Sequence, residues 1–233
     1  MIDPRTAALL LIDMQHGFID PSSALCVQGA AATVPACARA LDAARRRGAH
    51  VFHVVREYAE DGSDVEACRR EAWIAGGRPV SRACANPRSL EEPAPLAPQP
   101  GDRVIVKPRF SAFFATELDL LLRRLGVETV VLAGTTTPNC IRTTCYDALS
   151  LGYNAVILED CTSSRTPAVQ AANIEDMAHI GAHIMTCDEF CERGLAGAPD
   201  FATAAREALR EQDERIGQKA SCERNARDAE GLS

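Results

Sequence analysis

Three residues in this chain of 233 could together perform nucleophilic chemistry on a carbonyl carbon. Asp13, Lys107 and Cys140 supply a carboxylate, an ammonium and a thiol. A thiol becomes a strong nucleophile when it loses its proton, and a nearby ammonium or a helix N-terminus favours the thiolate. A carboxylate beside them can accept the thiol proton and later activate water. These residue types therefore predict a cysteine hydrolase, provided that the fold brings them into one crevice.

The elements around these residues are expected to do so. Apolar runs predict strands over 7–13, 50–55, 103–108, 129–135, 153–160 and 182–186, and helical stretches lie between most of them. Strands that alternate with helices predict an α/β fold whose parallel sheet is covered on both faces. Ligands bind such sheets outside the carboxyl ends of the strands. Asp13 closes the first predicted strand, Lys107 closes the third, and Cys140 follows the fourth at the start of a helix.

Three segments closely resemble the isochorismatase-like cysteine hydrolases. They are DMQHGFID (13–20), KPRFSAFFATELDLLL (107–122) and AGTTTPNCIRTTCYDALSLGYNAVILED (133–160). This superfamily includes nicotinamidases, N-carbamoylsarcosine amidases, biuret and ureidoacrylate amidohydrolases, and isochorismatases. The resemblance covers about residues 6–190. It implies a Rossmann-like, three-layer αβα fold with a six-stranded parallel sheet, and a catalytic triad of Asp13, Lys107 and Cys140.

The resemblance also implies an oxyanion hole in the loop before the cysteine. Members of the superfamily have a cis peptide bond there, which in this chain would join Thr135 and Thr136. Such a bond is costly and is tolerated where the surrounding structure holds it. It would aim the backbone amides of Thr136 and Cys140 at one point, where two donors can stabilise an oxyanion.

Departures from the superfamily pattern narrow the reaction. Isochorismatases that cleave a vinyl ether lack the nucleophile, so the presence of Cys140 favours hydrolysis of an amide or ureide C–N bond. Nicotinamidases carry a histidine-containing metal motif shortly after the second strand, whereas the segment VVREYAEDGSDVEACRR (54–70) contains no histidine. We therefore expect no metal and no cofactor. The predicted function is hydrolysis of a small amide, carbamoyl or ureide substrate through a covalent thioester, with release of ammonia or an amine.

Two other functions stay open at this stage. The chain could be a catalytically idle binding or scaffold protein with the same fold, or a metal-dependent enzyme of the nicotinamidase type. The intact set of Asp13, Lys107 and Cys140 argues against the first, and the missing histidines argue against the second.

Further side chains are expected to contact the substrate: Phe18, Arg56, Trp73, Arg109 and Arg142. The planar fork of an arginine can bind a carboxylate or a ureide oxygen, and aromatic rings can wall a pocket. Each arginine could instead form a surface ion pair, and each ring could belong to the core. Two other arginines, Arg82 and Arg165, are expected on the surface.

The composition excludes several classes of protein. The chain has 25 Lys and Arg against 32 Asp and Glu, a net charge of −7, which argues against a nucleic-acid binder. It has no apolar run long enough to span a membrane and no secretory signal, so we expect a cytoplasmic protein. Its ten cysteines include no CxxC pair, so most are expected to be small buried residues in a reducing compartment.

Two parts are predicted along the chain. Residues 1–195 should form the hydrolase domain, and residues 196–233 should form a C-terminal polar helix and a poorly ordered tail. The proline-rich segment 86–101 is expected to be a surface loop. The partner is a small-molecule substrate. The superfamily is commonly dimeric or tetrameric, which implies a homodimer or homotetramer.

Overall fold

A parallel sheet organises the larger of two units. The computed structural model describes residues 2–230, and in the last helix it describes side chains as far as residue 216 and at residue 218. The chain divides into the units Met1–Pro199 and Asp200–Ser233. The first unit holds a six-stranded parallel sheet with the order β3-β2-β1-β4-β5-β6. Its strands are β1 (Ala7–Ile12), β2 (His50–Val55), β3 (Arg103–Val106), β4 (Thr129–Thr135), β5 (Asn154–Ser163) and β6 (His183–Met185). The predicted fold class is confirmed.

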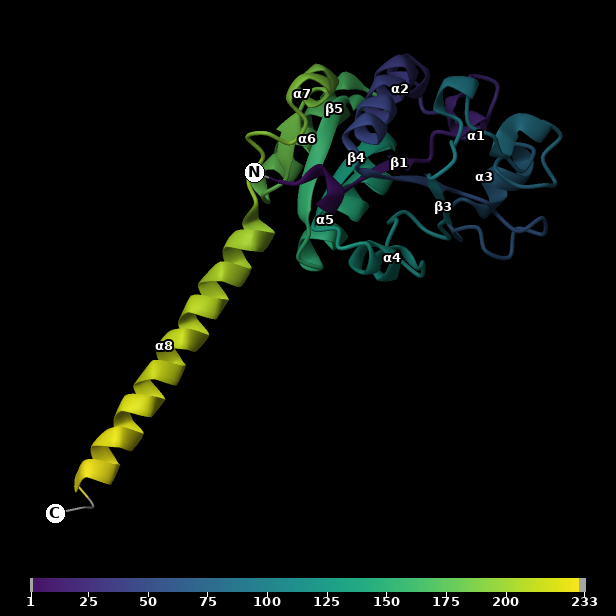
Figure 1. Ribbon diagram of the computed structural model, residues 1–233. Coiled ribbons are helices and arrows are strands. Elements are labelled where there is room, and N and C mark those ends of the chain that lie inside the picture. Colours follow the sequence, from purple (N-terminus) through teal and green to yellow (C-terminus); the bar gives the residue numbers. More distant parts are fainter. Residues whose placement is uncertain (1, 231–233) are drawn as a thin grey trace. The chain divides into compact units, whose positions relative to one another are not determined.

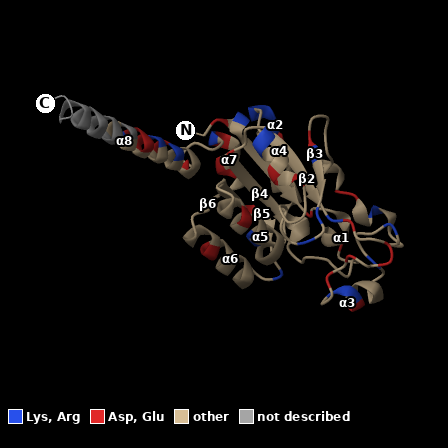
Figure 2. Ribbon diagram, turned by 90° about the horizontal axis from the view of Figure 1, so that it is seen from below, with Lys and Arg blue, Asp and Glu red and all other residues tan. Residues whose placement is uncertain are grey.

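Helices cover both faces of this sheet, which explains why its central strands are apolar along their whole length. The helices α2 (Ala30–Arg47) and α7 (Cys187–Arg193) pack on the face reached by alternate β1 side chains such as Leu9 and Leu11. The opposite face is covered by α4 (Leu118–Arg124), α5 (Arg142–Ser150) and α6 (Pro167–His179). Figure 1 shows α2 and α7 on one side of the strands and α4 and α5 on the other, and Figure 2 shows α6 beside α5.

One strand is longer than the sequence predicts. β5 continues to Ser163, whereas its polar pair Glu159 and Asp160 indicated an end at Asp160. A register shift after Leu132 lets β4 pair with the additional residues, with Gly134 opposite Thr162. The extension carries β5 to the edge of the sheet where β1 and β4 end.

A small separate cluster lies beside the sheet and includes the only tryptophan of the chain. It joins α1 (His16–Ile19) and α3 (Arg70–Ala75) through the buried side chains Phe18, Tyr58, Val65, Trp73 and Val80. The indole N–H of Trp73 donates to the Pro79 carbonyl at 2.8 Å. α3 begins at Arg70, and the preceding residues 67–69 form a turn.

The second unit consists of one helix, α8 (Phe201–Glu230). The sequence predicted a helix and a tail from residue 196, and the last residues of that tail, 231–233, lie outside the described residues. Among the helices described in residues 2–230, none combines the length and the apolar character needed to cross a bilayer.

Candidate active site

Asp13 and Cys140 lie where the strand order reverses, between the neighbouring strands β1 and β4. Asp13 directly follows β1 with a φ of 53°, and its backbone N–H donates to the Val54 carbonyl at 2.8 Å. Gly134 has a φ of 113°, and a side chain at this position would collide with the backbone of Ile12. Glycine therefore allows the two strand ends to approach closely, in the crevice where parallel sheets bind ligands.

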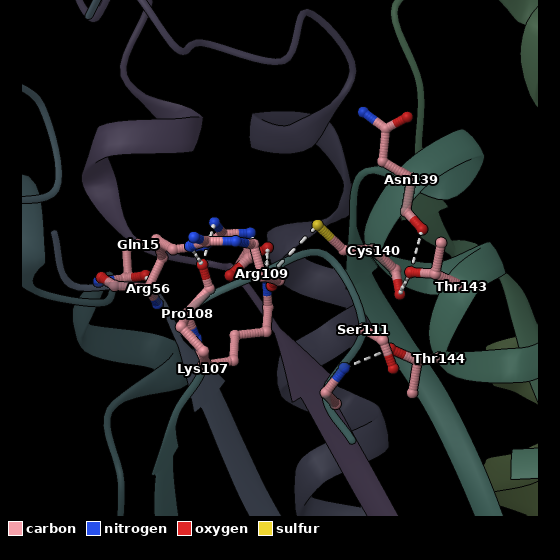
Figure 3. Close-up of polar contacts among 12 residues, drawn as sticks. Gln15, Arg56, Lys107, Pro108, Arg109, Ser111, Asn139, Cys140, Thr143 and Thr144 are labelled. Carbon is pink, nitrogen blue, oxygen red and sulfur yellow. Dashed lines mark hydrogen bonds and ion pairs between the residues drawn. The ribbon is translucent and has the colours of Figure 1, made fainter. Parts of the chain in front are cut away.

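Lys107 reaches the same point from β3, two strands away from β1. Its backbone N–H donates to the Val55 carbonyl at 2.9 Å and so continues the pairing of β3 with β2. Its Nζ lies 2.7 Å from Asp13 Oδ2 and donates to Cys140 Sγ at 3.5 Å and to the Arg109 carbonyl at 3.1 Å (Figure 3). Asp13 is 1% exposed, Lys107 0% and Cys140 6%. The structure thus brings the three residues into one buried cluster.

The turn that carries the thiol is anchored to β5. The peptide bond between Thr135 and Thr136 is cis. The hydroxyls of Thr136 and Thr137 donate to the Ser163 carbonyl at 3.2 and 2.9 Å. A π-helical turn over Thr137–Ile141 follows and leads into α5. The extended end of β5 therefore supports the loop that carries Cys140.

The thiol of Cys140 is neutral in the resting site. Burial raises its pKa to about 11, and the negative charge of Asp13 acts in the same direction. The positive charges of Lys107 and Arg56 lower the pKa but do not reverse the shift. The sequence predicted that the ammonium would favour the thiolate, and that expectation neglected the burial of the sulfur. A neutral thiol beside a carboxylate suits attack coupled to proton transfer.

A cavity of about 370 Å³ opens onto this cluster. Its apolar wall includes Phe18, Leu25 and Val27. Its polar lining includes Asp13, Arg56, Arg69, Thr135, Thr136, Asn139, Cys140 and Arg165. A cavity of this size, with an apolar wall and a polar lining around the cluster, suits a small-molecule substrate.

The five side chains expected to contact the substrate divide into two groups. Phe18 and Arg56 line the cavity. Trp73, Arg109 and Arg142 are not among its lining residues. The ring of Trp73 is 1% exposed and belongs to the small cluster beside the sheet.

The two arginines outside the cavity have protein partners instead. Arg109 donates to the Asp64 carbonyl at 2.8 Å. Arg142 forms an ion pair with Asp176 at 2.7 Å, and both side chains are 41% exposed. Both residues thus follow the alternative of an ion pair or structural contact, because the turns that hold them direct their side chains away from the cavity.

Two arginines that line the cavity were not among the side chains expected to contact the substrate. Arg165 was expected on the surface, and it is exposed, but it also lines the cavity. Because β5 ends at Ser163, the rule of inspecting strand ends would have found Arg165 had the strand been given its full length. Arg69 precedes α3 and stacks over the Phe110 ring, with 4.6 Å between its guanidinium carbon and the ring centre. Only the packing of the small cluster brings Arg69 to the cavity.

Within the described part of the chain, no group of three or more histidine, cysteine, aspartate or glutamate side chains has an arrangement that could hold a metal ion. The nine cysteines whose side chains are described are all unbridged.

A parallel α/β sheet with a thiol, a carboxylate and an ammonium at its switch point is typical of a cysteine hydrolase. The Isochorismatase domain model matches residues 7–189, and the chain belongs to this family. Its relatives include amidohydrolases, which supports a hydrolase.

Individual relatives agree with this assignment. The chain is 45% identical to an isochorismatase family protein from Desulfovibrio vulgaris subsp. vulgaris str. Hildenborough, whose crystal structure matches with a TM-score of 0.75 over 80% of this chain and 96% of that one. It is 40% identical over 190 residues to an Arabidopsis thaliana protein named probable inactive nicotinamidase, and the match covers 81% of this chain and 96% of that protein. It is 33% identical over 200 residues to maleamate amidohydrolase from Pseudomonas putida, covering 83% and 90%.

Proposed function

We propose that the protein is a metal-independent cysteine amidohydrolase that cleaves a C–N bond of a small amide, carbamoyl or ureide substrate. The observation that carries this proposal is the buried cluster in which Lys107 Nζ lies 2.7 Å from Asp13 Oδ2 and 3.5 Å from Cys140 Sγ. It stands at the base of a cavity large enough for such a substrate.

The first half of the reaction forms a thioester. Cys140 Sγ attacks the substrate carbonyl while its proton passes to the Asp13 carboxylate, which Lys107 holds in the same buried cluster. The amides of Thr136 and Cys140 stabilise the oxyanion of the tetrahedral intermediate. When the intermediate collapses, the C–N bond breaks and Asp13 gives its proton to the leaving nitrogen, which departs as ammonia or an amine.

The second half releases the acid. Asp13 takes a proton from water as the water attacks the thioester carbonyl. The C–S bond then breaks, the acid is released, and Asp13 returns the proton to the departing sulfur. Over the cycle the negative charge lies in turn on the carboxylate, on the oxyanion and on the departing sulfur. Lys107 contacts the carboxylate and the sulfur, so one fixed ammonium stabilises the charge on either of them without rearranging.

Two arginines of the cavity favour substrates that carry an acidic group. Arg69 and Arg165 line the cavity, and neither has an ion-pair partner among the described residues. A guanidinium binds a carboxylate through two parallel hydrogen bonds. The relative named maleamate amidohydrolase is consistent with this class of substrate.

A protein that binds without turnover is the second candidate, because a relative is named probable inactive nicotinamidase. The contacts of Lys107 with Asp13 and Cys140 support catalysis instead, since a scaffold does not need a buried ion pair against a thiol.

Ammonia release from a panel of amides, carbamoyl amino acids, ureides and biuret tests the proposal. Cys140→Ala should abolish release with the fold intact, and Cys68→Ala, which removes an exposed cysteine, should turn over like the wild type. Mass spectrometry should detect a thioester on Cys140 after rapid quenching. Turnover that survives Cys140→Ala would exclude the covalent mechanism, and chelator-sensitive release from nicotinamide would favour a metal-dependent nicotinamidase.

A further inference from the structure

A second buried cation lies against the catalytic cluster. Arg56 directly follows β2, is 1% exposed and lines the cavity. Its Nη1 forms an ion pair with Glu66 Oε1 at 2.7 Å and donates to the Tyr58 hydroxyl at 3.0 Å. Its Nε has no hydrogen-bond partner among the described residues. A charged side chain removed from water in this way is costly, so its position calls for a functional reason.

Arg56 and Lys107 share one backbone acceptor. The Arg109 carbonyl accepts from Arg56 Nη2 at 2.8 Å and from Lys107 Nζ at 3.1 Å. An ammonium has three donors, and those of Lys107 contact Asp13, the Arg109 carbonyl and Cys140. The direction of the donor toward the sulfur thus depends on where the Arg109 carbonyl is held. In Figure 3, Arg109 lies between the side chains of Arg56 and Cys140.

The backbone of Arg56 is held as firmly as its side chain. Its N–H donates to Gln15 Oε1 at 2.7 Å, and its carbonyl accepts from Gln15 Nε2 at 2.8 Å. Gln15 is 1% exposed and lies two residues after Asp13. The ends of β1 and β2 are therefore tied together beside the cluster.

Arg56 also acts on the cluster through its charge. Burial opposes its ionisation, but the charge of Asp13 and the hydrogen bond to Glu66 favour it, and the pKa of Arg56 stays above its usual value. The positive charge of Arg56 in turn lowers the pKa of Cys140. Burial likewise opposes ionisation of Glu66, yet hydrogen bonds from Tyr58 and Arg56 hold the pKa of Glu66 below its ordinary value. Two buried cations, Lys107 and Arg56, thus lower the pKa of the Cys140 thiol.

We propose that Arg56 is a positioning residue of the catalytic cluster. Held by Glu66 and Tyr58, it fixes the Arg109 carbonyl that aims Lys107 at the sulfur, and it places a second positive charge where the thiolate forms. This role rests on the proposed cysteine-hydrolase function. It differs from direct substrate binding because Arg56 acts through Lys107 and Cys140.

The test measures the thiol without needing a substrate. Iodoacetamide labelling of Cys140, followed peptide by peptide at pH 8.5, reports the thiolate fraction multiplied by its nucleophilicity. If Arg56→Met raises the pKa of Cys140 by about one unit, the thiolate fraction falls about tenfold, and the stronger nucleophile reduces the net effect to about three- to fourfold slower labelling. Arg82→Met is the matched control because it breaks an exposed ion pair with Glu57 of equal length, 2.7 Å. It should label like the wild type.

Two further variants separate position from charge. Arg56→Lys keeps the charge and loses the fork, so labelling should stay within about twofold of wild type while kcat falls and KM for a neutral amide is unchanged. If Arg56→Met does not fold, Arg56→Met/Glu66→Gln removes both charges and serves in its place. Wild-type labelling in a folded Arg56→Met or double variant would overturn the positioning role. A rise in KM alone in Arg56→Lys would show substrate binding instead and would overturn it too.

These outcomes are separate from those of the proposed function. Absence of turnover on every amide of the panel would refute the amidohydrolase, but the labelling rates would still report on Arg56. Unchanged labelling with normal turnover would refute the role of Arg56 alone.

Discussion

Removal of the ammonium at position 107 tests how much the fold depends on the buried ion pair between Lys107 and Asp13. Lys107 and Asp13 have side-chain exposures of 0% and 2% and lie 2.7 Å apart. Lys107→Met keeps a side chain of similar length but leaves a buried carboxylate without its cation. Breaking a buried pair in this way costs about 3–5 kcal/mol. Arg82→Met breaks an ion pair of the same length at 73% and 33% exposure, where the cost is about 0–1 kcal/mol.

Urea unfolding of the two variants and of wild type measures this difference. The double variant Lys107→Met/Asp13→Asn should recover at least about 2 kcal/mol of the loss, because it removes the unpaired charge as well. A Lys107→Met variant within about 1 kcal/mol of wild type would refute the reasoning, since the carboxylate would then be solvated or otherwise paired. Additive effects of the two substitutions would refute the direct pairing.

Three other measurements test separate parts of the site. In the folded state the Cys140 thiol has a pKa of about 11, whereas in the unfolded chain it ionises near pH 8.5. Its contribution to the free energy of unfolding is therefore complete below about pH 8.5 and is lost as the pH rises toward 11. Urea unfolding at pH 8 and 10.5 should therefore show about 2 kcal/mol more loss in wild type than in Cys140→Ala, and equal losses would contradict the neutral buried thiol. Arg69→Met and Arg165→Met should each raise KM about tenfold or more for amides with a carboxylate, since a hydrogen bond to a charged group contributes about 1.5–3 kcal/mol, and leave KM for neutral amides unchanged. A similar rise for both classes would count against an acidic substrate. Trp73→Ala should destabilise the protein by about 3–5 kcal/mol, because the ring is 1% exposed, and a loss below about 1 kcal/mol would show that the cluster can collapse around the gap.

The rule that ligands bind at the carboxyl ends of parallel strands located the three candidates, because backbone topology alone brings these strand ends together. Asp13, Lys107 and Cys140 each lie within a few residues of a strand terminus, and a parallel sheet brings such termini to one edge. The apolar runs predicted β2 and β4 with the observed bounds, since a strand buried on both faces has little polar sequence to obscure it.

The lining of the cavity was harder to predict because it depends on side-chain direction and on irregular segments. Arg142 is in the first turn of α5, close in sequence to Cys140, yet it turns to Asp176 on α6. The place of Arg165 could be predicted only from the true end of β5 at Ser163, and the acidic Asp160 indicated an earlier end. Arg69 and Trp73 lie in a segment of turns whose packing no periodic pattern records. Burial, which sets the pKa of Cys140, is likewise a property of the folded chain.

The place of β3 in the sheet links catalysis to local opening of the structure. β3 is four residues long, lies at the edge of the sheet and leaves Val104 and Val106 about half exposed. Edge segments with few buried contacts open at lower free energy than central strands. Each opening withdraws Lys107 from the sulfur while β1 and β4 remain paired. Heating should therefore inactivate the enzyme before the sheet melts, and the amide of Lys107, which bonds to Val55, should exchange with deuterium ahead of those in β4.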